Sequence, residues 1–162
     1  MTDWLTVPFF GDPVPRFVAV VRPSAYGIIP DGHGRLAVVR TPAGSYLPGG
    51  GQADSEAPEL TVVREAREEC GLAVRVGAWR RAAVEHVTST AEQTHFEKRS
   101  TFCDAVVIAP LASATDPDHA LVWVSPGEAL EVLRPGSHRW AIEQWLRDGD
   151  RLSGVQAPRP AV

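Results

Sequence analysis

Short apolar stretches recur along the chain, many of them rich in β-branched residues, and turns containing proline, glycine and aspartate separate them. Such runs are typical of strands. Pro23 interrupts the first of them, and Asp31-Gly32 suits the backbone angles of a hairpin turn. The pattern predicts strands over residues 17–21, 25–29, 36–40, 74–76, 79–87, 101–108 and 121–124, with polar residues 88–96 forming a loop.

Three helices are predicted between and after these strands. The first begins near Ser55 or Glu56, tolerates a proline in its first turn and stops at Gly71. The second starts at Ser125-Pro126-Gly127-Glu128, which has the form of a capping box. Ser137 is placed to cap the third, whose residues Ile142, Trp145 and Leu146 then face the core.

One domain accounts for the whole chain. A length of 162 residues suits a single core, and no internal repeat or linker divides it. The first 15 residues contain three prolines and are predicted to be an irregular lead-in. The domain is expected over residues 16–150, with a mobile tail over 151–162.

Charge and cysteine content exclude several classes of protein. The formal net charge of −4 argues against binding a nucleic-acid polymer, although a metal ion can still neutralise the phosphates of a free nucleotide. Cys70 and Cys103 are the only cysteines, so we expect two reduced, buried thiols, with one disulfide as the alternative. No leader-like segment or apolar run of about 18 residues is present, which predicts a cytoplasmic protein without a membrane partner.

The first helix has an unusual acidic face. At about 100° per residue, Glu65, Glu68 and Glu69 lie roughly opposite an apolar face formed by Val63, Ala66 and Cys70. Like charges three and four residues apart cost about 0.2–0.5 kcal/mol per pair. A bound divalent cation such as Mg²⁺ or Mn²⁺ reverses that cost, because both prefer hard oxygen ligands. Taken alone, the composition is more typical of a solvated helix face.

The spacing within LPGGGQADSEAPELTVVREAREECGL, residues 47–72, is more specific. Five residues separate Gly50 from Glu56, seven more precede Arg64-Glu65, and Glu68-Glu69, Gly71 and Leu72 complete the pattern. Seven fixed identities at roughly 7% each, over about 150 starting points, match by chance about once in a million sequences. The stretch resembles the Nudix box, Gx5Ex7REUxEExGU, where U is apolar, and matches it at every specified position.

The resemblance to Nudix hydrolases implies an α/β (α+β) fold, with a mixed β-sheet sandwiched between helices. It also implies divalent-metal hydrolysis of a diphosphate linked to another moiety. Glu65, Glu68 and Glu69 are then the metal-binding and catalytic carboxylates, with the carbonyl of Gly49 or Gly50 as a further ligand. Arg64 and Glu56 resemble the internal pair of the family, in which the arginine orients the carboxylates. Mg²⁺ or Mn²⁺ is the implied cofactor.

Residues around the box supply further candidates. Many family members have Glu where this chain has Ala53 and Gly where it has Ser55, without either being part of the box. Candidates for an extra acid beyond the box are Glu92 and Glu97, with Glu97 preferred because it borders a strand, although an ordinary solvated loop acid is the favoured interpretation of either. Tyr46 is a candidate for stacking on a base. For His86 and His95 ordinary polar roles are favoured, and Asp116 and Asp118 form either a turn or a base-reading element.

The sequence indicates the substrate less directly than the family. Family markers for ADP-ribose and dinucleoside-polyphosphate substrates are missing, and Val87, Thr88 and Ser89 occupy that zone. A MutT-like hydrolase of nucleoside triphosphates or related nucleotides, monomeric or homodimeric, is therefore expected. Two alternatives stay open: a catalytically silent Nudix-fold binding module, and an isopentenyl-diphosphate isomerase, for which Cys103 is the candidate catalytic cysteine.

Overall fold

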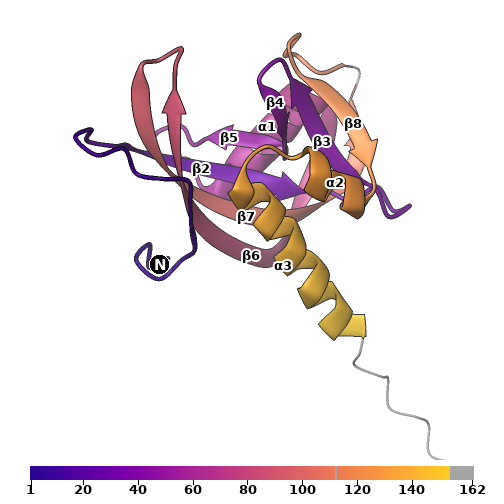
Figure 1. Cartoon of the computed structure of the whole chain (residues 1–162). Coiled ribbons are helices and arrows are strands. Elements are labelled where there is room, and N and C mark those ends of the chain that lie inside the picture. Colours follow the sequence, from indigo (N-terminus) through magenta and orange to yellow (C-terminus); the bar gives the residue numbers. More distant parts are fainter. Residues whose placement is uncertain (112, 154–162) are drawn as a thin grey trace, which may run out of the picture.

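The computed structural model describes residues 1–111 and 113–153. In this part of the chain five strands are followed by one helix, three more strands and two helices (Figure 1). The helices are α1 (Pro58–Cys70), α2 (Pro126–Val132) and α3 (Gly136–Ser153). The strands are β1 (Phe9–Phe10), β2 (Val20–Ile28), β3 (Leu36–Thr41), β4 (Gly44–Tyr46), β5 (Gly49–Gly51), β6 (Leu72–Ser89), β7 (Thr94–Pro110) and β8 (Ala120–Val124).

Two sheets organise the domain. The larger has the order β1-β6-β7-β2-β5 and is mixed, since β1–β6 and β7–β2 are parallel while β6–β7 and β2–β5 are antiparallel. The smaller has the order β4-β3-β8 and is antiparallel. Glycines 49–51 thus form the edge strand of the larger sheet, directly before α1 in the chain.

The sheets separate two hydrophobic clusters. Ala25 on β2 packs with Val62 and Ala66 of α1 in one cluster. Tyr26, the next residue on β2, packs with Ala141 and Ile142 of α3 in the other. Successive side chains on a strand point to opposite faces, so α1 and α3 cover opposite faces of the sheet. This arrangement confirms the expected mixed sheet sandwiched between helices.

The predicted interruption at Pro23 was wrong, because β2 runs through it from Val20 to Ile28. The carbonyl of Pro23 accepts a hydrogen bond from the backbone N–H of Gln52, just beyond the end of β5. The N and C=O of one strand residue point to the same side, so the missing N–H of Pro23 faces this free end of the ladder. A proline there removes no bond within the sheet.

The predicted loop over residues 88–96 was also wrong. β6 and β7 extend as one long hairpin, paired up to Ser89 and Thr94, and only residues 90–93 form the turn. Polar side chains pair across the hairpin, as where Thr88 Oγ1 lies 3.0 Å from His95 Nδ1. Residues 74–76 and 79–87, predicted as separate strands, both belong to β6, with a register shift between Val76 and Arg80.

The helix ends follow the sequence in most places. Pro58 is the first residue of α1, and Gly71 closes it with φ 63° and ψ 35°. Ser125 caps α2 in the expected capping box. The cap of α3 differs: the carboxylate of Glu85 on β6 accepts the backbone N–H groups of Gly136 and Ser137 and the hydroxyl of Ser137. Ser137 is thus a donor to this cap.

The ends of the domain differ from the expectation in detail. The lead-in contributes β1, which pairs with β6 at Val84 and Glu85. α3 continues to Ser153, so the predicted tail begins within this helix, and residues 154–162 lie outside the described residues. In the described part of the chain, no helix has the length and apolar character to cross a membrane.

Candidate active site

Glycine at positions 49 and 50 allows the edge strand β5 to lie against the acidic side chains of α1. Gly49 has φ 148°, and a Cβ there would lie 2.2 Å from the carbonyl oxygen of Ala25. A Cβ on Gly50 would lie 2.8 Å from Glu65 Oε1. Any side chain at either position would therefore collide with the strand or with the carboxylate, which gives the glycines of the box a steric reason.

Two of the three glutamates on the acidic face of α1 are withdrawn from solvent. The Glu65 side chain is 14% exposed, and Glu69 is 8% exposed. The backbone N–H of Gly49 lies 3.4 Å from Glu69 Oε2, which joins the glycine strand to the helix. Burial, and after it the charge of Glu65, raises the pKa of Glu69 well above its usual range, and the Gly49 contact opposes that rise. Ionisation of both carboxylates at once is therefore disfavoured unless another positive charge is present.

The expectation that Glu69 lies on the face opposite the core was only partly right. Glu69 is buried beside Cys70, whereas the Glu68 side chain is 45% exposed. The backbone of Glu68 instead anchors the following loop, since its carbonyl accepts the N–H groups of Thr115 at 2.9 Å and Asp116 at 3.1 Å. The loop covers this part of α1, and the charge of Asp116 further raises the pKa of Glu69.

Arg64 connects the acidic residues of the box. Its guanidinium donates two hydrogen bonds of 3.0 Å to the carboxylate of Glu56 and one of 2.7 Å to Glu65 Oε1. Further contacts reach Glu68 Oε2 at 3.4 Å and the carbonyl oxygen of Gly51 at 3.1 Å. These hydrogen bonds to Glu56, the largest single cause, lower the pKa of Glu56 to about 2, so it stays ionised and holds the arginine.

The donor set fits a hard divalent cation. Carboxylates of Glu65, Glu68 and Glu69 and the carbonyls of the glycine strand are oxygen ligands of the type that Mg²⁺ and Mn²⁺ prefer. Among the described residues no group of three His, Cys, Asp or Glu side chains already converges on one point. Arg64 contacts both Glu65 and Glu68, so its positive charge partly compensates theirs. The buried Glu69 has no such partner among the ion pairs of the described residues.

A cavity of about 350 Å³ opens beside Glu69 and Gly49. Asp118 and His119 also line it, although the sequence singled out only the aspartate, as part of a turn or a base-reading element. His119 Nδ1 lies 2.6 Å from Asp116 Oδ2. An acidic cavity next to the box suits a cation and the phosphates that accompany it.

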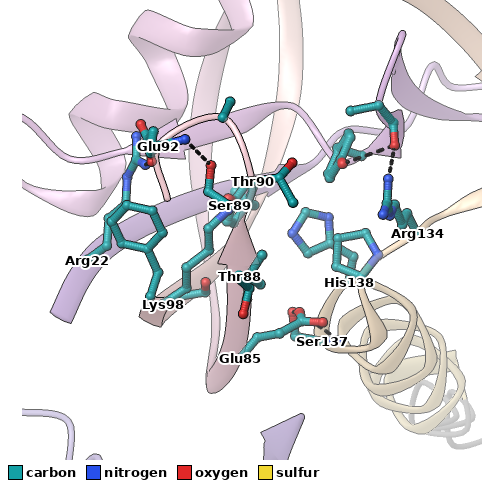
Figure 2. Close-up of a pocket in the computed structure, with 18 residues that line it drawn as sticks. Arg22, Glu85, Thr88, Ser89, Thr90, Glu92, Lys98, Arg134, Ser137 and His138 are labelled. Carbon is teal, nitrogen blue, oxygen red and sulfur yellow. Dashed lines mark hydrogen bonds and ion pairs between the residues drawn. The ribbon is translucent and has the colours of Figure 1, made fainter. Parts of the chain in front are cut away.

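A larger cavity of about 560 Å³ lies on the α3 side of the sheet (Figure 2). Tyr26, Ala43 and Tyr46 line both cavities, which therefore adjoin. His138 of α3 lies at this junction, with its ring centroid 4.2 Å from that of Tyr26. Burial lowers the pKa of His138 from 6.5 to about 3, so this imidazole is neutral and its Nδ1 accepts the N–H of Leu47 at 3.1 Å. Tyr46 is thus placed where an aromatic group of a ligand can reach it.

The other candidates have different surroundings. Glu97 forms an ion pair with Arg99 at 2.8 Å and lines neither cavity, whereas Glu92 lines the larger one. His86 and His95 stack on each other with centroids 5.4 Å apart, and they too lie outside both cavities. Cys70 and Cys103 are free and buried, as expected.

Three residues of the larger cavity were missed: His138, Glu85 and Lys98. Lys98 carried no clear signal, because it stands between two other charged residues, Glu97 and Arg99. His138 and Glu85 meet their partners across large separations in the chain, 91 residues in the case of Leu47 and His138. No local pattern indicates contacts of that range.

Comparison with known proteins identifies the family. The model of the NUDIX domain matches residues 20–147, which is most of the chain. The chain therefore belongs to the NUDIX family, and with an intact box it is a Nudix hydrolase. Enzymes of this family generally use divalent metals and act on small nucleotide substrates. A search of curated protein sequences found no match.

Solved structures with the same fold are distant in sequence. A Nudix hydrolase from Nitrosomonas europaea has a TM-score of 0.62 at 17% identity, covering 88% of this chain and 100% of the other. The ORF135 protein of E. coli has a TM-score of 0.60 at 23% identity, covering 90% and 100%. An ADP-ribose pyrophosphatase from Streptococcus suis has a TM-score of 0.54 at 18% identity, covering 78% and 92%. At these identities the likeness concerns the fold.

Proposed function

We propose that this chain hydrolyses a diphosphate linkage within a nucleoside diphosphate linked to another moiety, with a nucleoside triphosphate or a related nucleotide as substrate. The observation that carries the proposal is the buried pair of Glu65 and Glu69, held against Gly49 and Gly50, in which ionisation of the second carboxylate is disfavoured. A site of this kind is costly without a cation and becomes favourable with one.

Each residue of the box has a role in this proposal. Glu65, Glu68 and Glu69, with the carbonyl of Gly49, would hold Mg²⁺ or Mn²⁺. The ion supplies charge neutralisation of the diphosphate and a lowered pKa for the attacking water. Arg64 positions the carboxylates through its contacts with Glu65 and Glu68.

Positioning of Arg64 depends in turn on Glu56. The carboxylate of Glu56 accepts four contacts, two from Arg64, one from the hydroxyl of Thr61 at 2.8 Å and one from the backbone N–H of Ala53 at 3.0 Å. A carboxylate with all these partners is fixed in one orientation, so it serves as an anchor and not as a proton acceptor.

The isomerase alternative loses its candidate residue. Cys103 is fully buried, packs in the cluster that contains Ala25 and Val62, and has its thiol pKa raised by burial to about 11. A neutral thiol inside the core cannot reach a ligand at the box. The alternative of a silent binding module is tested by the same assay as the hydrolase.

The experiment is a panel screen with Mg²⁺ and with Mn²⁺. Nucleoside triphosphates, nucleotide sugars and dinucleotide diphosphates are compared with p-nitrophenyl phosphate, and phosphate or pyrophosphate release is measured. We expect turnover of at least one diphosphate and faster turnover of it than of the monoester. Reaction in ¹⁸O-water should place the label on a phosphorus product. No metal-dependent turnover of any compound would instead support the binding module.

Variants connect the activity to the box. Glu68→Gln and Glu69→Gln should each lower kcat by about 100-fold or more, since removing a metal ligand removes stabilisation of transition-state charge. Glu131→Gln is the matched control, because Glu131 is an exposed glutamate of α2, away from both cavities. Near-wild-type turnover in both box variants would refute the assignment of these carboxylates.

A further inference from the structure

The chain contains a single lysine among its 16 lysine and arginine residues, and that lysine, Lys98, lines the larger cavity. Its side chain rises from β7 into the cavity beside Ser89, with Arg22 on the same side and Arg134 and His138 on the other (Figure 2). The other 15 of these residues are arginines, so the only lysine side chain, with its compact ammonium group, lies at this place.

Strand pairing places Lys98 in a row of charged residues across three strands. Arg22 of β2 is its partner on one side and Glu85 of β6 is its partner on the other. The carboxylate of Glu85 is already engaged by the backbone N–H groups and the hydroxyl at the start of α3. None of the ion pairs among the described residues includes Lys98, although it is half-buried. Burial, followed by the charge of Arg22, lowers its pKa.

Arg22 is also held loosely. Its ion pair with Glu92 is 3.7 Å long, and the two side chains are 43% and 52% exposed, which makes the pair weak. The guanidinium lies 5.2 Å from the centroid of the Phe96 ring, so one face is supported while its N–H donors stay available. Arg22 and Lys98 are thus adjacent cations whose neighbouring carboxylates are held loosely, as in the 3.7 Å pair with Glu92, or are engaged at the start of α3, as for Glu85.

The position of this pair relative to the box follows from β2. Gly49 of the box pairs with Tyr26, and Arg22 is four residues before Tyr26 on the same face of the strand. Four residues of strand span about 13 Å between Cα atoms. Both basic side chains line the larger cavity, which adjoins the acidic one. A ligand whose diphosphate lies at the box can extend past Tyr26 and Tyr46 to Arg22 and Lys98.

We propose that Arg22 and Lys98 bind a second phosphate group of the substrate, separate from the scissile diphosphate and carried on the sugar of the nucleotide. A phosphate monoester has nearly two negative charges and three acceptor oxygens, which matches two adjacent cations and the hydroxyl of Ser89 near them. The position of the diphosphate rests on the proposed function. The preferred substrates are therefore nucleotides phosphorylated at a second site.

A binding experiment tests this assignment without catalysis. Pyridoxal 5′-phosphate forms an imine with amines, and reduction with borohydride makes this label permanent. Peptide mass spectrometry then distinguishes labelling of Lys98 from labelling of the amino group of Met1, which is fully exposed. In EDTA, coenzyme A should protect Lys98 at a concentration at least 10-fold lower than dephospho-coenzyme A, which lacks only the 3′-phosphate. Labelling of Met1 should not change with either compound. Equal protection by the two compounds, or none, would overturn the proposal.

A kinetic experiment uses the same logic. The ratio of kcat/KM for ADP-ribose 2′-phosphate to that for ADP-ribose should exceed 10 in the wild type and fall at least 10-fold in Lys98→Gln, mainly through KM. Lys98→Arg should retain most of the preference, because the charge remains. Arg75→Gln, which removes an exposed arginine of β6 away from both cavities, should keep the wild-type ratio. An equal ratio in Lys98→Gln and the wild type would contradict the role of Lys98.

The two proposals fail separately. If none of the four compounds (coenzyme A, dephospho-coenzyme A, ADP-ribose 2′-phosphate and ADP-ribose) is hydrolysed with Mg²⁺ or Mn²⁺, the proposed hydrolysis of such nucleotides fails. The protection of Lys98 still decides the second phosphate site in that case. If both members are hydrolysed equally well and Lys98 is not selectively protected, the hydrolase stands and the second phosphate site is refuted.

Discussion

Replacing His138 with asparagine should change how the stability of the domain depends on pH. His138 is 2% exposed, and charging it would place a proton on the Nδ1 atom that accepts the N–H of Leu47. The unfolded chain therefore binds a proton more readily, with a pKa of 6.5 against about 3 in the folded protein. Because the folded value is depressed, the stability linked to His138 is complete above pH 6.5 and is lost as the pH falls towards 3.

The size of the effect follows from these two values. Between pH 7 and pH 5 the proton taken up only by the unfolded chain lowers the free energy of unfolding by about 2 kcal/mol. In His138→Asn the side-chain oxygen can still accept the N–H of Leu47, but no proton is taken up in this range. The variant is less stable at pH 7 because the smaller side chain leaves a cavity beside Tyr26. Its loss between pH 7 and pH 5 should nevertheless be about 2 kcal/mol smaller.

Comparing the variant with the wild type cancels the contributions of the other titrating groups to the pH dependence of stability. The raised pKa of Glu69 acts in the opposite direction, since the folded state then holds its proton more tightly and gains stability as the pH falls. Urea unfolding of wild type and variant in EDTA, at pH 7 and pH 5, leaves this contribution the same in both. The exposed His33→Asn variant is the control and should follow the wild type. Equal losses in wild type and His138→Asn would refute the argument from the buried neutral imidazole.

Three further outcomes are expected. Millimolar Mg²⁺ or Mn²⁺ should raise the melting temperature measured by calorimetry, and less so in Glu65→Gln, because an ion that binds only the folded state stabilises it. Gly50→Ala should lower kcat about 10- to 100-fold, with a smaller effect on the melting temperature. The new Cβ would lie 2.8 Å from Glu65 Oε1 and would push that oxygen out of its position. Glu85→Gln should reduce the free energy of unfolding by about 1–3 kcal/mol in urea titrations, since it weakens the charged cap of α3.

The box and its register could be predicted because both are local. Glu56 and Arg64 are eight residues apart, and the two helix ends depend on Pro58 and Gly71, so the sequence contains all the information for that part of the site. The depth of Glu69 in the structure was not predictable in the same way. A helical projection places it beside Glu65, but the projection includes neither the strand residue Gly49, which contacts Glu69, nor the loop that bonds to the carbonyl of Glu68.

Other features of the fold depend on contacts made at long range. Pro23 and residues 88–96 look unlike strand residues in isolation, yet the ladder has a free end at Pro23 and the two arms of the hairpin supply each other with hydrogen bonds. Propensity is a weak guide where pairing determines the structure. The larger cavity has the same origin, because β2, β6, β7 and α3 all contribute to its wall.

β2 separates two functions by the alternation of its side chains. Ala25 and Gly27 pack against α1, while Arg22 and Tyr26 face the cavity on the other side. A change at one set of positions leaves the other set in place, so under the two proposals substrate selection could diverge among descendants of this chain while the box stays constant. The same alternation sets a limit on that divergence: an insertion or deletion of one residue within β2 would exchange the two faces and abolish both functions together.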